Sequence, residues 1–316
     1  NPDVNGSLGK YANPALRSFT TKEIQQKHDQ MKAKRIKRTR GNWYSDKRLE
    51  PNAVGDKKVS RNVHSVTAIC YKSNLRDNGQ GFLELKVRPY KEVYYLCRCE
   101  RFYGQPVAAG IMWTGVLVAE DIVATSAHIV RETNVRNLCF IFGFLMEFPG
   151  DQYPITLFSK ENVYYGVNII HREYDVDGPH ATGSDWALVR LDRKVVGQET
   201  AGISKKPVTA GQKIYALGHP CGLSMKYSPH GKIISIEKAY FTSEIDLYSG
   251  NSGSPVFDAG NHQMIGIVSG SDSVDFDWDE KYCGFHSVTY PHKQFKSNGG
   301  RIIKVTEFLD FLNPNS

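Results

Sequence analysis

Three short stretches of the sequence carry side chains that together could perform nucleophilic catalysis. His128 ends an apolar stretch, Asp185 follows a Gly-Ser pair, and Ser252 has a glycine within two residues on either side. A serine hydroxyl is a weak nucleophile at neutral pH, and a neighbouring imidazole can accept its proton. A carboxylate can hold that imidazole in one tautomer and stabilise its cation. We therefore predict that His128 is the general base, Asp185 the orienting acid and Ser252 the nucleophile.

The glycine before the serine predicts a second part of the same chemistry. The attacked carbonyl becomes an oxyanion and needs preorganised N–H donors, each worth about 2.7–4 kcal/mol of the barrier. Gly250 has no side chain to obstruct its own amide. We expect the amides of Gly250 and Ser252 to form this oxyanion hole. Each residue alone is more often structural, so the prediction depends on the joint order His, Asp, Ser, which differs from the orders in α/β-hydrolases and subtilisins.

The elements that would position these residues are mostly strands. From about residue 61, short runs rich in β-branched and aromatic residues recur, punctuated by Gly, Pro, Asn and Asp. They include Val63–Tyr71, Val93–Arg98, Ile122–Thr125, Ala187–Leu191 and Met264–Ser269. Many strands without intervening helices indicate a sandwich or barrels. Two segments have helical signals instead: 21–39, with a capping box at Thr20 and Glu23, and Ile302–Leu312, with apolar residues at helical spacing.

Composition excludes two classes of protein. The 316 residues are 40% hydrophobic and 23% charged, which is too apolar for a chain disordered throughout. No apolar run reaches the roughly 18 residues that a membrane-spanning helix needs. Because the sequence starts at Asn1 without a leader, we expect a removed targeting segment or a processed piece of a longer chain.

The positive charge of the chain lies in its N-terminal part. Residues 1–60 contain 14 Lys and Arg against 6 Asp and Glu, a balance of +8, whereas the remainder contains 26 against 27. We interpret residues 1–60 as a basic, partly helical arm. It could be a solvated arm, a pro-segment, or a tether for nucleic acid or another polyanion.

The sequence indicates no cofactor and no metal site. Six cysteines allow 15 pairings, which the sequence leaves open, and Cys97 and Cys99 alternate along an expected strand without forming a CxxC pair.

On the order His128, Asp185, Ser252 and the stretch Gly250-Asn-Ser-Gly253, the chain resembles trypsin-like serine proteases of the chymotrypsin fold (PA clan). It is most similar to bacterial glutamyl-endopeptidase-like peptidases, with viral serine proteases as cousins. The resemblance spans about residues 61–316, which we expect to form the protease domain. It implies an all-β fold of two six-stranded antiparallel barrels with a catalytic cleft between them, to which the sequence adds a C-terminal helix.

The resemblance also implies roles for residues around the serine. Asp246, six residues before Ser252, would lie at the floor of the primary specificity pocket and favour Arg or Lys before the scissile bond. Val268 stands where glutamate-specific relatives carry His, which argues against a preference for Glu. Ser269 and Gly270 would lie beside the substrate backbone.

One further residue of the resemblance is expected to be structural, and two positions depart from the family pattern. His219, in the stretch Gly218-His-Pro-Cys-Gly222, is expected to be structural. Ile129 replaces a cysteine that often follows the catalytic histidine. Asn251 replaces the aspartate that pairs with a new N-terminus in digestive trypsins, so activation by that route is not expected.

Two functions follow. The first is a serine endopeptidase acting on protein or peptide substrates through an acyl-enzyme. The alternative is a structural or binding component of a larger assembly, such as a virion protein, with little or no activity. A secreted, periplasmic or virion-associated location is expected over a cytoplasmic one.

Overall fold

The computed structural model describes residues 46–96, 100–177, 180–271, 276–278, 284–286 and 300–312. The chain divides into two compact units. The larger comprises residues 47–87, 108–272 and 298–316, and the smaller comprises residues 1–46, 88–107 and 273–297. Of the predicted basic arm, residues 46–60 are described, whereas the helix expected over 21–39 lies outside the described residues.

In the smaller unit, α3 (Tyr90–Val93) is a single helical turn, and β17 (Phe276–Trp278) pairs with β18 (Gly284–His286). The strand predicted over Val93–Arg98 is therefore wrong at its start. The Tyr94 amide donates to the Tyr90 carbonyl at 3.1 Å, and the two rings pack edge to face, so local contacts close a turn. Cys97 and Cys99 lie outside the described residues.

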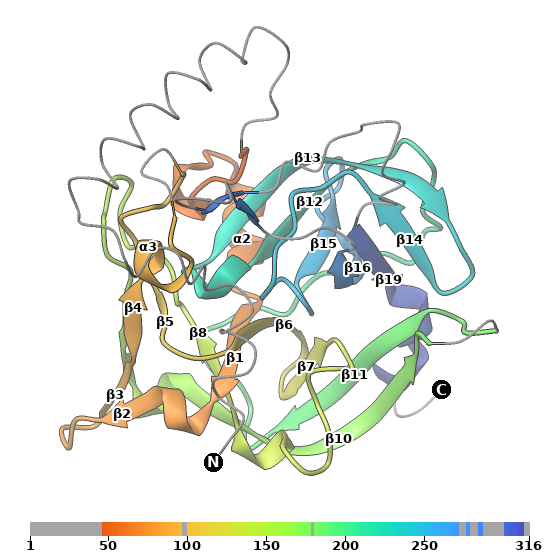
Figure 1. Ribbon diagram of the computed structural model, residues 1–316. Coiled ribbons are helices and arrows are strands. Elements are labelled where there is room, and N and C mark those ends of the chain that lie inside the picture. Colours follow the sequence, from red (N-terminus) through yellow and green to blue (C-terminus); the bar gives the residue numbers. More distant parts are fainter. Residues whose placement is uncertain are drawn as a thin grey trace, which may run out of the picture. The chain divides into compact units, whose positions relative to one another are not determined.

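The larger unit contains two closed antiparallel barrels of six strands each (Figure 1). The first has the strand order β1-β6-β7-β11-β10-β8. Its strands are β1 (Val66–Tyr71), β6 (Met112–Ala119), β7 (Ile122–Thr125), β8 (Leu138–Phe142), β10 (Val163–Asp175) and β11 (Ser184–Leu191). The sequence did not predict β10, although it is the longest of the six.

The second barrel has the strand order β12-β13-β14-β19-β16-β15 and lies in the cyan to blue part of Figure 1. Its strands are β12 (Lys213–Gly218), β13 (Lys226–Ile236), β14 (Tyr240–Ser243), β15 (Pro255–Asp258), β16 (Met264–Ser271) and β19 (Gly300–Lys304). The all-β fold of two six-stranded barrels predicted from the sequence is confirmed.

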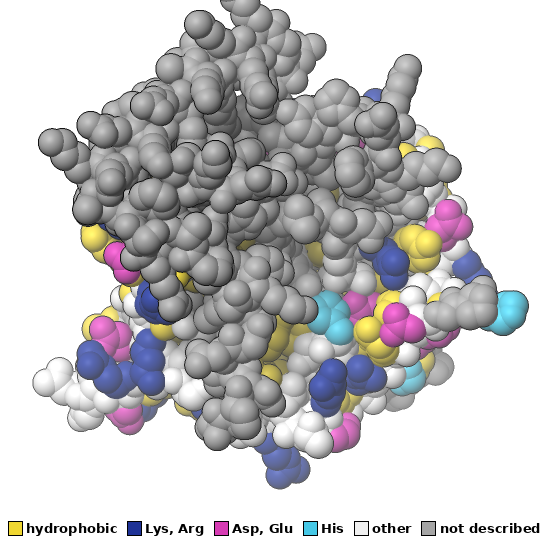
Figure 2. Space-filling model, in the orientation of Figure 1, with side chains coloured by type: hydrophobic (Ala, Val, Ile, Leu, Met, Phe, Trp, Pro, Cys, Tyr) yellow, Lys and Arg dark blue, Asp and Glu magenta, His cyan; other side chains and the backbone are white. Residues whose placement is uncertain are grey.

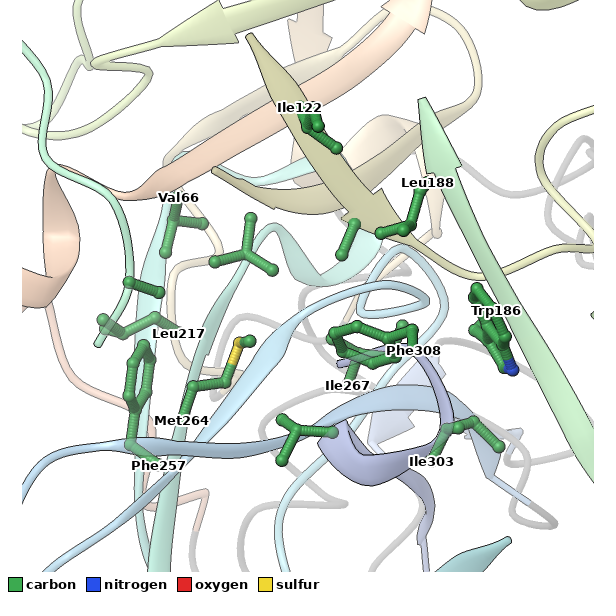
Figure 3. Packing of buried hydrophobic residues seen from close by; sticks show 14 of the residues in the cluster. Val66, Ile122, Trp186, Leu188, Leu217, Phe257, Met264, Ile267, Ile303 and Phe308 are labelled. Carbon is green, nitrogen blue, oxygen red and sulfur yellow. The ribbon is translucent and has the colours of Figure 1, made fainter. Parts of the chain in front are cut away.

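A shared apolar cluster packs the two barrels against each other. Figure 3 shows its side chains gathering from both barrels around one interior. In β11, Trp186 and Leu188 belong to this cluster, while Ala187 and Val189 fill the first barrel. Successive side chains of a strand point to opposite faces. Because both faces of β11 are buried from Trp186 to Val189, this part of the strand is continuously apolar. A shift of one residue would exchange the two faces, so the register is fixed.

The C-terminal helix predicted over Ile302–Leu312 is wrong. Residues 300–304 form β19, and only single 3₁₀ turns follow, at Val305–Glu307 and Asp310–Leu312. Ile302 packs in the interior of the second barrel, whereas Ile303 packs in the cluster between the barrels. Adjacent residues buried on opposite sides require a strand, which β-branched side chains favour. The helical spacing was produced by a strand followed by turns.

The remaining elements are short. β2 (Leu75–Asp77), β3 (Phe82–Leu85) and β9 (Leu157–Ser159) form a three-stranded sheet, and β4 (Val87–Pro89) pairs with β5 (Pro106–Ala108). The helix α2 (Lys57–Val63) is N-capped by the Asp56 carboxylate. Further 3₁₀ turns lie at Pro51–Ala53, Lys72–Asn74, Val135–Asn137, Lys160–Asn162 and Pro220–Gly222.

The charged surface is mixed in sign where it is described. Figure 2 shows Lys and Arg side chains beside Asp and Glu on one face. Exposed ion pairs include Lys160–Asp77 and Arg190–Asp121. Cys70, Cys139 and Cys221 are buried. No helix in the described part of the chain is long and apolar enough to cross a membrane.

Candidate active site

His128 and Asp185 are joined by two hydrogen bonds. Asp185 lies in β11, and His128 follows β7, its neighbour in the first barrel. The His128 amide donates to Asp185 Oδ1 at 3.0 Å, and His128 Nδ1 lies 2.8 Å from Asp185 Oδ2. A carboxylate only accepts, so Nδ1 carries the proton and Nε2 is the acceptor. The pair therefore has the polarity that a general base needs.

The carboxylate of Asp185 is buried, whereas one third of the His128 side chain is exposed. Burial by itself raises the pKa of Asp185, but the hydrogen bonds and charge of His128, together with a bond from Ser269, outweigh it. The pKa of Asp185 therefore lies below its ordinary value, and the group is ionised at neutral pH.

Ser269 has a contact that the sequence reasoning did not foresee. Its hydroxyl, buried in β16 of the second barrel, donates to Asp185 Oδ2 at 2.6 Å. Its side chain thus completes the environment of the carboxylate. The predicted place beside a substrate backbone, for Ser269 and for the half-exposed Gly270 next to it, stays a prediction.

Arg172, in the unpredicted strand β10, donates hydrogen bonds to the backbone of the segment that carries His128. Its Nε donates to the carbonyls of Ala127 and Val130, at 3.0 and 2.8 Å. These carbonyls flank His128 on either side, so one guanidinium fixes the backbone around the imidazole. The β-branched and aromatic residues concentrated between Val163 and Ile170 were the available signal for this strand.

The stretch Gly250-Asn-Ser-Gly253 forms a tight turn with φ of +95° at Gly250 and +81° at Gly253. A Cβ on Gly250 would lie 2.4 Å from the His219 carbonyl, and one on Gly253 would lie 2.1 Å from the Thr114 carbonyl. Both the left-handed backbone and the close approach require glycine here. The glycines are thus dictated by the local conformation of the turn.

Most polar backbone groups of this turn have hydrogen-bond partners, whereas two of its amides have none in the described part of the chain. The carbonyls of Ser249, Asn251 and Ser252 accept from the amides of Cys221, Ser254 and Thr114, at 2.5, 2.8 and 3.1 Å. The amides of Asn251 and Gly253 donate to Tyr248 and Val268. Among the described residues, the amides of Gly250 and Ser252 donate to no backbone or side-chain acceptor. These are the two amides predicted to face the oxyanion.

The Ser252 side chain is half-buried, and its hydroxyl donates to the Ser269 carbonyl at 3.4 Å. Within the described residues no hydrogen bond joins Ser252 to His128. Ser252 is nevertheless connected to the acid–base pair, because Ser269 also bonds Asp185. Catalytic hydrogen bonds are often formed only when substrate is bound.

Asp246 is half-buried in the segment between β14 and Ser252. Its Oδ2 accepts from the Lys47 amide at 3.3 Å, and its carbonyl accepts from the Ser228 hydroxyl at 2.9 Å. Val268 is buried in the apolar interior of the second barrel. The pocket role of Asp246 and the argument from Val268 against a preference for Glu both stay predictions.

His219 is fully buried and is stacked on Phe144, with Nδ1 3.2 Å from the Leu223 carbonyl. Burial lowers its pKa to about 3, so it is neutral at physiological pH. In the ranges described, no three His, Cys, Asp or Glu side chains are grouped so that they could hold a metal ion.

Comparison with known proteins shows what this chain is similar to. Residues 113–267 match the family model described as a trypsin-like peptidase domain. The glutamyl endopeptidase of Staphylococcus epidermidis is 28% identical over 177 residues. That match spans 52% of this chain and 56% of the relative, little more than half of each.

A solved structure, of a Glu endopeptidase in complex with MPD, is similar in fold. It is 16% identical, with a TM-score of 0.50, and the match covers 85% of this chain and 96% of that one. The predicted resemblance to trypsin-like serine proteases of the chymotrypsin fold is confirmed.

Proposed function

We propose that this chain, whose residues 113–267 match the trypsin-like peptidase domain, is a serine endopeptidase acting through an acyl-enzyme. The observation that carries the proposal is the hydrogen-bonded pair of His128 and Asp185, linked through Ser269 to a glycine turn at Ser252. A base, a buried acid and a hydroxyl in one unit supply the groups that acyl transfer requires.

In the proposed reaction, Ser252 Oγ attacks the carbonyl carbon of the scissile bond while His128 Nε2 takes its proton. Asp185 stabilises the resulting imidazolium and does not itself become protonated. The negative oxygen accepts from the amides of Gly250 and Ser252. His128 then gives its proton to the leaving amine, and water repeats the sequence on the acyl-enzyme. The reaction requires the Ser252 hydroxyl to leave the Ser269 carbonyl, to which it is bonded in the structure, and to donate to the imidazole. We expect a change of the χ1 rotamer of Ser252 to accompany this step.

The decisive test is covalent labelling of the full chain with a fluorophosphonate, located by tandem mass spectrometry. We expect label on Ser252 in the wild type and none in Ser252→Ala. The matched control is Ser235→Ala, which removes another hydroxyl of the second barrel, one bonded to Thr242, and should leave labelling unchanged. Folded wild-type protein that carries no label on Ser252 would disprove the proposal.

We further propose that the enzyme cleaves after Arg or Lys. The support is Asp246, whose half-buried carboxylate lies six residues before Ser252 and could make charge-assisted hydrogen bonds to a basic side chain. Peptides that differ only in the residue before the scissile bond test this, with Asp246→Asn expected to remove the preference. Cleavage after Glu, as the name of the staphylococcal relative suggests for that protein, would overturn it.

A second candidate is a binding module with the protease fold and little activity. It is favoured by one contact, since the Ser252 hydroxyl is bonded to the Ser269 carbonyl and not to His128. Under this alternative the wild-type chain would remain unlabelled while it stays folded. The same labelling experiment therefore separates the two functions.

We also propose that the segment 1–60 contacts a polyanion, because its formal net charge is +8. Binding of the full chain to single-stranded DNA should weaken steeply with salt, since phosphate contacts release counterions. Replacement of Lys32, Lys34 and Lys37 by Gln should reduce both the affinity and the salt dependence. Equal binding by the two proteins would contradict this role.

A further inference from the structure

Thr114, a residue of β6 in the first barrel, lies beneath the serine turn of the second barrel. It is completely buried, and its backbone pairs with Ala68 of β1. The turn packs directly on this strand, because a Cβ on Gly253 would meet the Thr114 carbonyl and one on Gly250 would lie 3.3 Å from the Met112 carbonyl. Thr114 therefore belongs to the surface on which the turn rests.

Every polar atom of Thr114 is bonded at this junction. Its hydroxyl donates to the Gly250 carbonyl at 2.9 Å and accepts from the His219 amide at 3.0 Å. Its amide donates to the Ser252 carbonyl at 3.1 Å, and its carbonyl accepts from the Thr125 hydroxyl at 2.8 Å. One side chain thus connects the turn that carries the serine to the turn that begins at His219.

These bonds restrict how the peptide groups of the serine turn can rotate. A trans peptide is planar, with its carbonyl and its N–H pointing in opposite directions, so a bond to the carbonyl also sets the direction of the N–H. The Gly250 carbonyl is held by the Thr114 hydroxyl and the Ser252 carbonyl by its amide. The peptides that carry the two free amides are held at their own carbonyls, Ser249 by the Cys221 amide and Asn251 by the Ser254 amide. The two peptides that Thr114 anchors are their direct neighbours in the turn, so the Thr114 bonds restrict how the turn as a whole can rotate.

Of the polar groups of Thr114, only the hydroxyl depends on the identity of the side chain. The backbone bond to Ser252 does not depend on the side chain at position 114, unless that residue is proline. The bonds to Gly250 and His219 need a hydroxyl, whose single oxygen both donates and accepts. Glycine at position 250 makes this restraint necessary, because it has the widest conformational freedom of any residue. Without the hydrogen bond from the Thr114 hydroxyl, the peptide that follows Gly250, where φ is +95°, loses one restraint on its orientation.

We propose that the Thr114 hydroxyl is a positioning group for the oxyanion hole, orienting the turn so that the amides of Gly250 and Ser252 face the developing charge. The inference rests on the proposed function, since it gives that reaction a residue from the first barrel that acts on the backbone of the second. Thr114 touches no reacting atom.

The test compares three variants of the full chain. Thr114→Val keeps the shape of the side chain and removes the hydroxyl, and Thr114→Ser restores it. Thr67→Val is the matched control, because Thr67 is also completely buried in the first barrel and its hydroxyl bonds only the adjacent Ala68 carbonyl. The measurements are kcat and KM on a peptide substrate, the inhibition constant of a peptide boronate, and hydrogen exchange of residues 247–255.

Loss of one direct oxyanion donor typically lowers kcat by about 10²–10³-fold, and we expect an indirect effect of about 10- to 100-fold for Thr114→Val. KM should change little, because the lost interaction serves the transition state. The boronate, whose tetrahedral adduct places an oxygen in the hole, should weaken in parallel with kcat. Exchange over 247–255 should become faster, and Thr114→Ser should recover most of each effect.

A purely structural hydroxyl gives a different result. Equal changes in Thr114→Val and Thr67→Val, or a fall in activity without faster exchange over 247–255, would overturn the proposal. If the wild type neither cleaves nor is labelled, the proposed function fails, and the exchange measurement still judges the restraint. Unchanged exchange in Thr114→Val would then reject the positioning role by itself.

Discussion

The two barrels hold their parts of the candidate site in different ways. In the first barrel, two side chains bond each other: the imidazole of His128 bonds the carboxylate of Asp185. That carboxylate also accepts a hydrogen bond from the hydroxyl of Ser269, which comes from the second barrel. In the second barrel, the turn around Ser252 is held almost entirely through its backbone carbonyls and amides. The first arrangement depends on the chemistry of the functional groups, and the second depends on backbone conformation.

This difference determines which substitutions each half tolerates. A side-chain pair is lost when a functional group changes even if its shape is kept, because protonation and charge are what it supplies. A backbone turn is insensitive to most functional groups but is disrupted by a Cβ at a left-handed position. Four substitutions test this contrast, in decreasing order of expected effect.

The largest effect is expected for Asp185→Asn. The amide of Asn has nearly the same shape as the carboxylate but no charge. It can favour the His128 tautomer that carries its proton on Nε2, and it does not stabilise the His128 imidazolium, so kcat should fall by about 10⁴-fold. The control is Asp192→Asn, which alters an exposed carboxylate paired with Arg193 and should leave kcat unchanged. Steady-state kinetics at pH 7 checks both, and a loss below tenfold would contradict a catalytic role for the pair.

Gly250→Ala tests the backbone half. The new Cβ would lie 2.4 Å from the His219 carbonyl, so the turn must move and its free amide with it, lowering kcat by about 10²–10³-fold. Gly211 also has a positive φ, +79°, but no atom lies within 4 Å of its Cβ position. Gly211→Ala should cost about 1 kcal/mol of stability and no activity. Similar kinetics for both variants would refute the backbone argument.

Ser269→Ala tests the hydrogen bond that Asp185 receives from the second barrel. Removal of one hydrogen bond to the carboxylate should lower kcat by about three- to tenfold and raise the pKa of Asp185, because Ser269 contributes to its depression. Ser126→Ala is the control, since that hydroxyl donates to the Val268 carbonyl and not to the carboxylate. A carbon-13 titration of Asp185 measures the pKa, and an unchanged value would contradict the assigned contact.

The smallest effect concerns His219 and stability. Burial lowers its pKa from 6.5 to about 3, so between these values the unfolded chain binds more protons than the folded one. Stability should therefore fall as the pH falls from 6.5, by up to about 1.4 kcal/mol per pH unit from this group. Urea unfolding at pH 7 and pH 4 should show a smaller decrease in His219→Gln than in the wild type. Equal decreases would argue that His219 is not held neutral.

Local patterns predicted much of the fold. Runs such as Ile122–Thr125 and Ala187–Leu191 are strands, because β-branched and apolar residues in short runs favour buried strands. The helical reading of Ile302–Leu312 was wrong because a strand buried on both faces imitates the spacing of a helix. β10 was not predicted, and with it the bonds from Arg172 to the His128 segment were missed.

By itself, the sequence determined which chemical groups are available. It supplies a histidine, an aspartate and a serine in that order, glycines where the turn needs them, and enough short apolar runs to form barrels. Only the tertiary structure decided which groups meet. The His128–Asp185 bond joins residues 57 apart, Ser269–Asp185 joins residues 84 apart, and Thr114–Gly250 joins residues 136 apart. The first contact forms because β7 and β11 are neighbours in one barrel, and the other two form because the two barrels pack against each other. No local pattern encodes a hydrogen bond across such a separation.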